Sequence, residues 1–159
     1  MTSTLSATAT PLPAAAAATE HLIPERWETA NRHLIRKALA EFSHERILHP
    51  EPVSTPETDE PAYRLVSDDG CAEYRFTARR LPLNHWSVPA AGIRRFTGAR
   101  GPAPAVETAL DALVFITEFS ATLGINDQML PLYLEEISST LSSHAFKNRP
   151  GAPSSALLA

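Results

Sequence analysis

The chain has 159 residues, of which 43% are hydrophobic and 20% charged, and this composition is typical of one globular domain with one core. Its formal net charge of −4 disfavours general electrostatic binding to DNA or RNA, which relies on a basic surface. Cys71 is the only cysteine, so an internal disulfide is impossible, and no apolar run approaches the ~20 residues that span a bilayer. We therefore expect a cytoplasmic protein without nucleic-acid or membrane partners.

The two ends differ in composition from the rest. Residues 1–22 are rich in Ser, Thr, Pro and Ala, which predicts a disordered leader. The stretch before Glu20 has no Lys or Arg, which argues against a secretory signal. Residues 150–159 do not resemble the natural end of a domain and are interpreted as a truncated linker. Residues 23–149 are then expected to form the domain.

Helical periodicity opens this domain. Apolar residues recur every three or four positions from Trp27, which predicts an amphipathic helix that begins near Pro24 and continues to about Leu48. Asn31 lies on the apolar stripe, and a buried amide needs hydrogen-bond partners. We expect it to bind a backbone group, in the sheet, and so to fix how the helix docks. Residues 50–61 carry four prolines and four acids and are expected to form an exposed loop.

Alternation of apolar and polar residues follows. Residues 72–79 alternate strictly, which predicts a strand with one buried face, and 63–66 form a shorter strand before it. Ser67-Asp68-Asp69-Gly70 has the composition of a hairpin turn. A third strand is expected around Trp86 and a fourth at 92–96, where Ile93 and Phe96 cannot both face inward without a bulge. These segments predict a small, mostly antiparallel four-stranded sheet.

Two further helices are predicted. Residues 105–123 read as a helix that stops at Gly124 and that is apolar around most of its circumference. Such a helix belongs deep inside a protein, so we expect it to need cover from additional polypeptide. The third helix is predicted at Leu130 to Lys147, with Pro131 in its first turn. The expected fold class is α+β, with three main helices and the four-stranded sheet.

Catalytic motifs are weak throughout the sequence. It contains no HExxH pair, no nucleophile elbow around the serines at 138–143 and no phosphate loop, since Gly98-Ala99-Arg100-Gly101 lacks the required pattern. His44 with Glu41 or Glu45 could hold a metal weakly, but a solvated helix face is the preferred interpretation. Acidic neighbours of Cys71 favour a structural thiol. We assign no catalytic, cofactor-binding or metal-binding residue.

Charged residues gather in two other places. The carboxylates of the predicted helices are interpreted as lying on the solvent-exposed faces of those helices. They are Glu107, Asp111, Glu118, Glu135 and Glu136. The arginines of the sheet region could receive an anionic partner or a phosphate-bearing ligand, although an exposed sheet face is the simpler interpretation. This basic group comprises Arg75, Arg79, Arg80, Arg94, Arg95 and Arg100.

One resemblance to a known family extends over residues 24–149. The segment Trp27 to Arg46 resembles the N-terminal helix of the IucA/IucC family of NRPS-independent siderophore synthetases, and is most similar to the desferrioxamine synthetases. The resemblance continues through Tyr74-Arg75-Phe76-Thr77-Ala78 and His85-Trp86-Ser87-Val88. It is clearest in Leu130-Pro131-Leu132-Tyr133-Leu134-Glu135-Glu136-Ile137-Ser138-Ser139-Thr140-Leu141.

The resemblance implies both a fold and a parent activity. It implies the N-terminal thumb of a cupped enzyme, in which helices pair with an antiparallel sheet. It also implies that the parent uses ATP and Mg²⁺ to adenylate a carboxylate, which an amine or hydroxylamine then attacks. For the desferrioxamine branch the implied substrate is an N-hydroxy-N-succinyl diamine. The family's ATP-binding residues lie beyond the thumb, and His49-Pro50 does not match its histidine-proline motif.

The expected role of the chain alone is therefore structural. We expect it to be catalytically inactive, to bind no cofactor by itself, and to pack against the fingers and palm of the synthetase, with a homodimer contact as a further possibility. An alternative is a free-standing interaction module that binds a partner protein through exposed apolar helix surface. A nucleic-acid binder that uses the arginine group is a weaker third interpretation.

Overall fold

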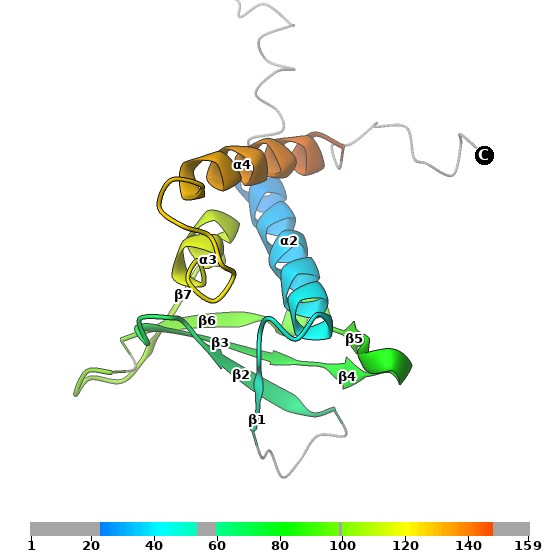
Figure 1. Ribbon diagram of the computed structural model, residues 1–159, viewed down its shortest axis with the longest axis vertical. Helices are drawn as coiled ribbons and strands as arrows, with labels where there is room; N and C mark the ends of the chain where they lie inside the picture. Colours follow the sequence, from blue (N-terminus) through cyan, green and yellow to red (C-terminus); the bar gives the residue numbers. More distant parts are fainter. Residues whose placement is uncertain (1–22, 54–59, 99, 148–159) are drawn as a thin grey trace, which may run out of the picture.

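The computed structural model describes residues 23–53, 60–98 and 100–147, so the expected leader (1–22) and linker (150–159) lie outside the described residues. Figure 1 shows the arrangement of its helices and strands. In chain order they are α2 (Pro24–His44), β1 (Glu51–Val53), β2 (Ala62–Val66), β3 (Ala72–Thr77), β4 (Arg79–Arg80), η2 (Pro82–Asn84), β5 (Trp86–Ser87), η3 (Ala90–Gly92), β6 (Arg94–Thr97), β7 (Val106–Thr108), α3 (Ala112–Glu118) and α4 (Leu130–Lys147).

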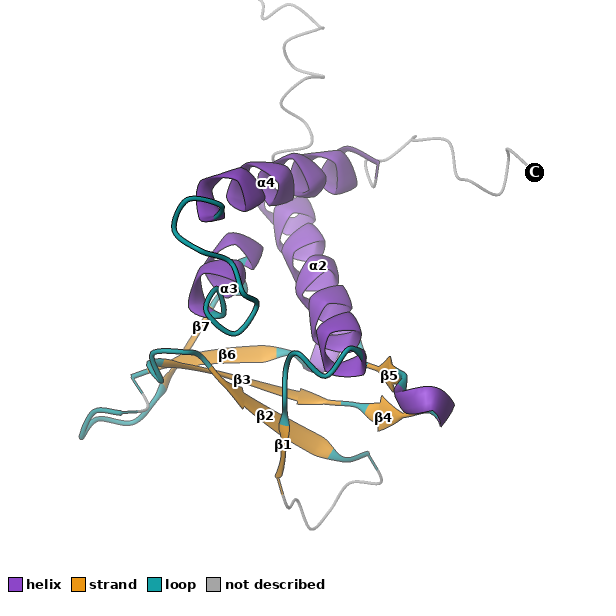
Figure 2. Ribbon diagram, in the orientation of Figure 1, coloured by secondary structure: helices purple, strands orange, loops and turns teal. Residues whose placement is uncertain are grey.

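Helices and sheet form separate layers. The main sheet has the strand order β1-β2-β3-β6-β7, and every neighbouring pair is antiparallel. Helices α2 and α3 rise from one face of this sheet, and α4 lies across their far ends (Figures 1 and 2). The predicted α+β class with three main helices is confirmed. Within the described part of the chain, no helix has both the length and the hydrophobicity of a membrane span.

The sheet faces follow the predicted alternation. Tyr63 pairs with Phe76 and Leu65 with Tyr74 across β2 and β3, and all four side chains are buried. Such cross-strand pairs stabilise a sheet because their side chains meet on one face. The hairpin between the two strands turns at Gly70, whose φ of 73° lies in the left-handed region that glycine adopts readily. The hairpin and both of its strands are therefore confirmed.

The main sheet has five strands, whereas four were predicted. Glu51–Val53 forms the edge strand β1 inside the expected loop at 50–61, of which residues 54–59 lie outside the described ranges. Pro52 is tolerated there because an edge strand leaves some N–H positions unpaired. The predicted strand around Trp86 is β5, which pairs only with β4 in a separate two-stranded sheet. The fourth predicted strand, at 92–96, corresponds to β6 (Arg94–Thr97) in the main sheet.

The predicted helix at 105–123 is wrong at both ends: its first seven residues are not helical, and α3 ends at Glu118, so that 119–123 form turns. Val106–Thr108 forms strand β7 on the edge beside β6, and α3 begins only at Ala112. Asp111 sets this start: its backbone is extended, and its carboxylate accepts hydrogen bonds from the N–H groups of Leu113 and Val114. An aspartate that caps a helix satisfies free N–H groups that a continuous helix would not present.

The expectation that this segment needs additional polypeptide to bury it is also wrong for its aromatic residues. Phe115 and Phe119 are each 1% exposed, because Tyr74 of β3 packs on both rings. Val106, which belonged to the predicted helix, instead lies exposed on β7. The chain therefore buries the apolar side of the short helix by itself.

Helix α2 ends four residues before the predicted Leu48. The N–H of Ile47 bonds to the carbonyl of Phe42 at 2.9 Å, and the N–H of Arg46 bonds to that of Ser43 at 3.2 Å. This is the Schellman arrangement, which closes a helix by turning one residue into the left-handed region. Here that residue is Arg46, with a φ of 60°. The reversal returns Leu48 to the core, where it is buried.

Asn31 fixes α2 to α3 and not to the sheet. The residue is 2% exposed, as the sequence predicted. Its Nδ2 donates to the carbonyl oxygen of Trp27 at 2.9 Å, and its Oδ1 accepts from the N–H of Ala112 at 2.8 Å. Ala112 is the first residue of α3, so one amide holds the start of α3 against the middle of α2. The expected backbone partner exists, but it belongs to a helix.

We predict that Asn31→Ala lowers the free energy of unfolding by about 2 kcal/mol. The substitution removes the side-chain oxygen that accepts from the first N–H of α3, and it leaves this buried N–H without an acceptor. Urea unfolding monitored by circular dichroism measures the loss. Thr29→Ala is the matched control: the exposed Thr29 hydroxyl bonds only to the Glu25 carbonyl of the same helix. Equal losses for the two variants would contradict the proposed role of Asn31.

Candidate functional site

The most distinctive surface of the helical layer is an apolar groove between α2, α3 and α4. It encloses about 180 Å³. Leu34, Ala38 and Phe42 supply one wall from α2, and Ile137 of α4 lies opposite. Lys37 and Glu41 provide its polar lining. The remaining lining residues are Ile35, Ala112, Phe115 and Ile116. Such an opening suits an apolar side chain from outside.

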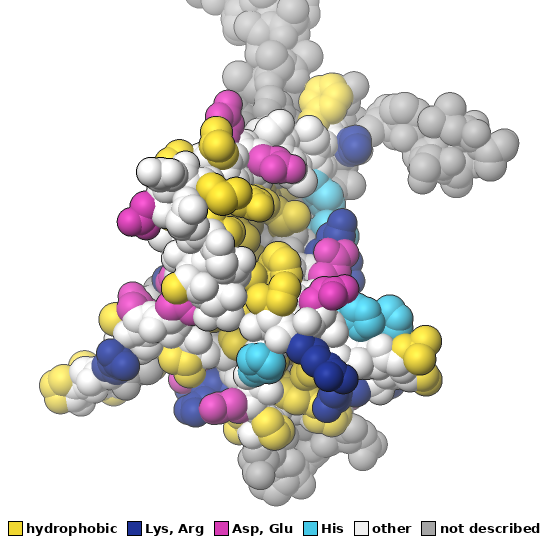
Figure 3. Space-filling model, in the orientation of Figure 1, with side chains coloured by type: hydrophobic (Ala, Val, Ile, Leu, Met, Phe, Trp, Pro, Cys, Tyr) yellow, Lys and Arg dark blue, Asp and Glu magenta, His cyan; other side chains and the backbone are white. Residues whose placement is uncertain are grey.

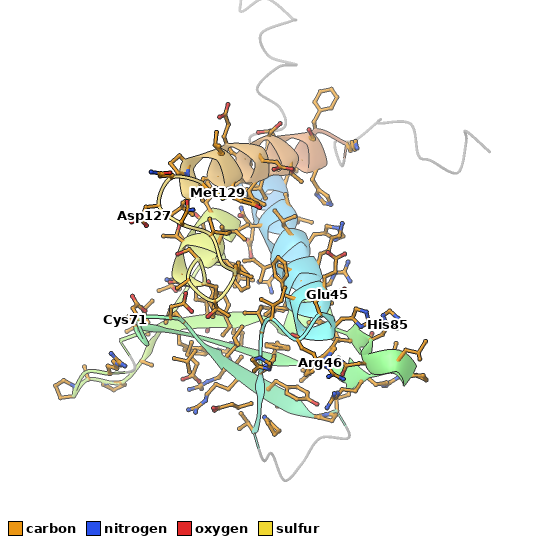
Figure 4. The ribbon with its side chains drawn as sticks, viewed as in Figure 1. Glu45, Arg46, Cys71, His85, Asp127 and Met129 are labelled. Carbon is orange, nitrogen blue, oxygen red and sulfur yellow. The ribbon has the colours of Figure 1, made fainter. Side chains whose placement is uncertain are left out.

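Further exposed apolar side chains lie around the start of α4, outside the lining of the groove. Leu132 is 66% exposed, and Met129 and Tyr133 are exposed as well. Figure 3 shows hydrophobic side chains gathered below α4 and between α4 and α2, and Figure 4 places Met129 at the start of α4. Leu141 and Ala145 of α4 are fully buried, and Leu130, Leu134 and Ile137 pack partly buried against the core.

A polar cluster fixes the opposite side of α3. The Tyr74 hydroxyl donates to Glu118 Oε2 at 2.6 Å, and the Arg95 guanidinium forms an ion pair with the same carboxylate. Arg95 also donates to the Thr108 hydroxyl at 2.6 Å. Burial raises the pKa of Tyr74 well above its ordinary value, and the adjacent Glu118 carboxylate raises it further. The phenol therefore stays neutral and serves as a hydrogen-bond donor.

The cluster corrects the interpretation of the helical carboxylates. Glu118 is mostly buried, with a side chain 13% exposed, so it is not on a wet face. Glu107 lies on β7, and Asp111 caps α3, so these three acids share no helix stripe. Only Glu135 and Glu136 are exposed on a helix as expected. No local sequence pattern predicts the Tyr74–Glu118 contact, because 44 positions separate the two residues.

The predicted basic group is largely neutralised by carboxylates. Arg75 pairs with Glu73 at 2.6 Å, Arg79 with Glu60 at 3.5 Å and Arg94 with Glu107 at 2.5 Å. Arg95 pairs with Glu118, as described above. The structure therefore does not bring the six arginines together as one cationic surface. The simpler interpretation, a charged sheet face, describes most of them.

The other candidate residues lie apart from one another. The His44 ring stacks on His85 with centroids 4.2 Å apart, instead of facing Glu41 or Glu45 with a metal between them. Cys71 is exposed, and its thiol contacts the Asp69 carbonyl. In the described ranges, no group of three or more His, Cys, Asp or Glu side chains could hold a metal ion.

A histidine pair bridges α2 and α4. The rings of His33 and His144 stack with centroids 4.6 Å apart. Burial lowers the pKa of His33, with Arg36 and Lys37 adding to the effect; burial also lowers the pKa of His144, assisted by His33 and Lys147. The sequence had shown only scattered histidines, because the contact depends on how the two helices cross.

This pair predicts a loss of stability in acid. Since both pKa values are lowered from 6.5 on folding, protons bind the unfolded chain more strongly, and stability falls as the pH drops below about 6.5. We expect His144→Gln to reduce the decline in urea midpoint between about pH 7 and pH 5. His49→Gln, at an exposed histidine, is the control. An unchanged pH dependence in His144→Gln would contradict this.

Glu118→Gln should lower the free energy of unfolding by about 2–3 kcal/mol, because it leaves the mostly buried Arg95 cation without its counter-charge. Thermal and urea unfolding at neutral pH measure the effect. Glu107→Gln removes a carboxylate from the exposed pair with Arg94 and should cost less. A Glu118→Gln variant as stable as Glu107→Gln would show that the buried cluster contributes little.

Two known proteins of siderophore biosynthesis are similar in sequence to this chain. Putrebactin synthase of Shewanella sp. (strain MR-4) is 39% identical over 127 residues, which are 80% of this chain and 19% of that protein. The rhizobactin siderophore biosynthesis protein RhbF of Rhizobium meliloti (strain 1021) is 28% identical over 122 residues, 76% of this chain and 18% of that protein. The chain thus spans about a fifth of the length of these relatives. No family model matches it.

Solved structures share the fold. Aerobactin synthetase IucC from a hypervirulent pathotype of Klebsiella pneumoniae superposes with a TM-score of 0.60 at 23% identity, over 80% of this chain and 21% of that one. Petrobactin biosynthesis protein AsbB from Bacillus anthracis str. Sterne gives 0.62 at 14% identity, over 86% and 22%. Sequence and fold agree with the resemblance carried by Trp27 to Arg46: the chain belongs to the IucA/IucC family of siderophore synthetases.

Proposed function

We propose that this chain is the thumb-like part of an ATP-dependent siderophore synthetase. The whole enzyme would adenylate a carboxylate and pass the acyl group to an amine or hydroxylamine. Support comes from the 39% identity to a putrebactin synthase, together with the shared α+β fold. The resemblance at Trp27 to Arg46 further supports a desferrioxamine-type substrate, an N-hydroxy-N-succinyl diamine. ATP and Mg²⁺ would bind the enzyme outside this chain.

The apolar groove carries the proposal for what these residues do. A chain that spans a fifth of its relatives leaves an apolar groove open between its helices, and it leaves Leu132 and Tyr133 of α4 exposed. Exposed apolar surface of this kind is covered in a larger assembly, because its burial removes it from water. The proposed partner is the remainder of the synthetase. In this arrangement α4 is the contact element, and the sheet forms an outer wall.

The chain alone is predicted to be catalytically inactive, because the acyl-adenylate chemistry would need the absent parts. The test adds ATP, Mg²⁺ and an N-hydroxy-N-succinyl diamine to the purified 159-residue chain and measures pyrophosphate release. Putrebactin synthase is the positive control for the assay. Release by the chain well above the enzyme-free rate would refute the structural role.

A chimaera tests the contact element. Residues 23–149 replace the matched 127 residues of putrebactin synthase. We predict that the chimaera retains pyrophosphate release and that Leu132→Glu reduces it at least about tenfold, because a carboxylate would have to be buried in the contact. Thr140→Glu, on the same helix at an exposed position outside the groove, is the control. The isolated chain should tolerate Leu132→Glu, since Leu132 is exposed. Full activity of the Leu132→Glu chimaera would contradict docking through α4.

A further inference from the structure

A second, polar pocket lies at the opposite end of α2, where that helix meets β1, β2 and the small β4–β5 sheet. It encloses about 400 Å³. Among the residues that the structure describes, its lining includes two guanidinium groups and one imidazole but no carboxylate. Figure 4 places Arg46 at this end of α2. The lining residues are Ser43, Arg46, Leu48, His49, Pro50, Pro52, Tyr63, Arg80, Asn84 and Trp86.

Backbone strain concentrates at this pocket. In the described ranges, three residues other than glycine have a positive φ: Arg46 at 60°, Leu83 at 61° and Asn84 at 61°. Arg46 and Asn84 both line the pocket. Arg46 occupies the position after a helix end at which glycine is strongly favoured, because a Cβ is disfavoured in the left-handed region. A costly arginine at a glycine position indicates that its side chain serves a purpose.

The two pocket arginines, Arg46 and Arg80, differ from five other arginines of the strands. Arg64, Arg75, Arg79, Arg94 and Arg95 each pair with a carboxylate. Arg80 instead donates to Asn84 Oδ1 at 2.6 Å and lies 5.2 Å above the Trp86 ring, so a neutral amide and an aromatic face orient it. No ion pair of Arg46 occurs within the described ranges. Among the described residues, neither pocket arginine therefore pairs with a carboxylate.

Two buried polar groups of the same pocket lack partners. The hydroxyl of Ser43, a residue 4% exposed, and the indole Nε1 of Trp86 have no hydrogen-bond partner in the described part of the molecule. The indole N–H can only donate, so it requires an acceptor. Unpaired buried donors cost free energy, and they are rare in folded proteins. Both atoms are shielded from solvent, so they adjoin the pocket without opening into it.

We propose that this pocket binds an oxyanion, the phosphate or carboxylate group of a small ligand. Arg46 and Arg80 supply the charge, and the Trp86 ring packs against the Arg80 guanidinium. Planar guanidinium groups match both kinds of oxyanion because they can donate two parallel hydrogen bonds. The inference rests on the pocket alone and stands apart from the proposed synthetase activity.

The test uses the two tryptophans of the chain as reporters. Sodium phosphate and, separately, sodium malonate are titrated into the ¹⁵N-labelled 159-residue chain at constant ionic strength, while the indole N–H signals of Trp86 and Trp27 are followed by NMR. We expect a saturable shift of the Trp86 signal with little change at Trp27. A response to phosphate only identifies a phosphate site, and a stronger response to malonate identifies a carboxylate site.

Matched variants separate binding from folding. Arg46→Gly removes the guanidinium and places glycine at the left-handed position, so it should raise the Tm while weakening binding at least about tenfold. Arg80→Gln should also weaken binding. Arg79→Gln removes the same charge from a neighbouring residue outside the pocket, and its affinity should match that of the unaltered chain.

Three outcomes would overturn the oxyanion pocket. One is a Trp86 signal that neither anion moves, and another is an equal shift on adding sodium chloride. The third is binding that Arg46→Gly leaves intact, because the strained arginine would then have no role in it.

Discussion

The contact of Tyr74 with α3 is the interaction on which the rest of this fold depends. Its ring packs against Phe115 and Phe119, and its hydroxyl donates to Glu118 on the same short helix. One residue of the central strand β3 thereby joins the sheet to the helical layer through both apolar and polar contacts. Asn31 completes the joint from the other side, because it binds the first N–H of α3. Helix α3 has only seven residues, so its stability must come from these tertiary contacts.

The same arrangement separates a closed side of the helical layer from an open one. The sheet-facing side of α3 is buried, whereas the groove with Leu34 and Ile137 remains open toward α4. The core is therefore fully buried near the sheet, while apolar side chains near α4 remain accessible. This arrangement is consistent with a domain that packs against the rest of a larger enzyme. The oxyanion pocket lies at the other end of α2, so the two proposed contacts occupy different surfaces of this helix.

Much of the fold could be predicted from local patterns, and the errors share a physical cause. Periodicity identified α4 at its observed bounds, and the alternation at 72–79 identified the buried face of β3. The segment around Val106 was misjudged because pairing with β6 overrides an apparent helical period, and Asp111 then starts a new element. The pockets could not be predicted, because they form between residues far apart in the sequence. Only Asn31 signalled a long-range contact in advance, since a polar residue on an apolar stripe requires a partner.

Native-state hydrogen exchange on the isolated 159-residue chain tests most directly whether it completes its own core around α3. If it does, the amide protons of Phe115 and Phe119, which bond to the carbonyls of Asp111 and Phe115, should exchange only by global unfolding, together with those of β3. Rapid exchange at Phe115 and Phe119 while β3 remains protected would contradict this account, because it would show that α3 needs another polypeptide to stay folded.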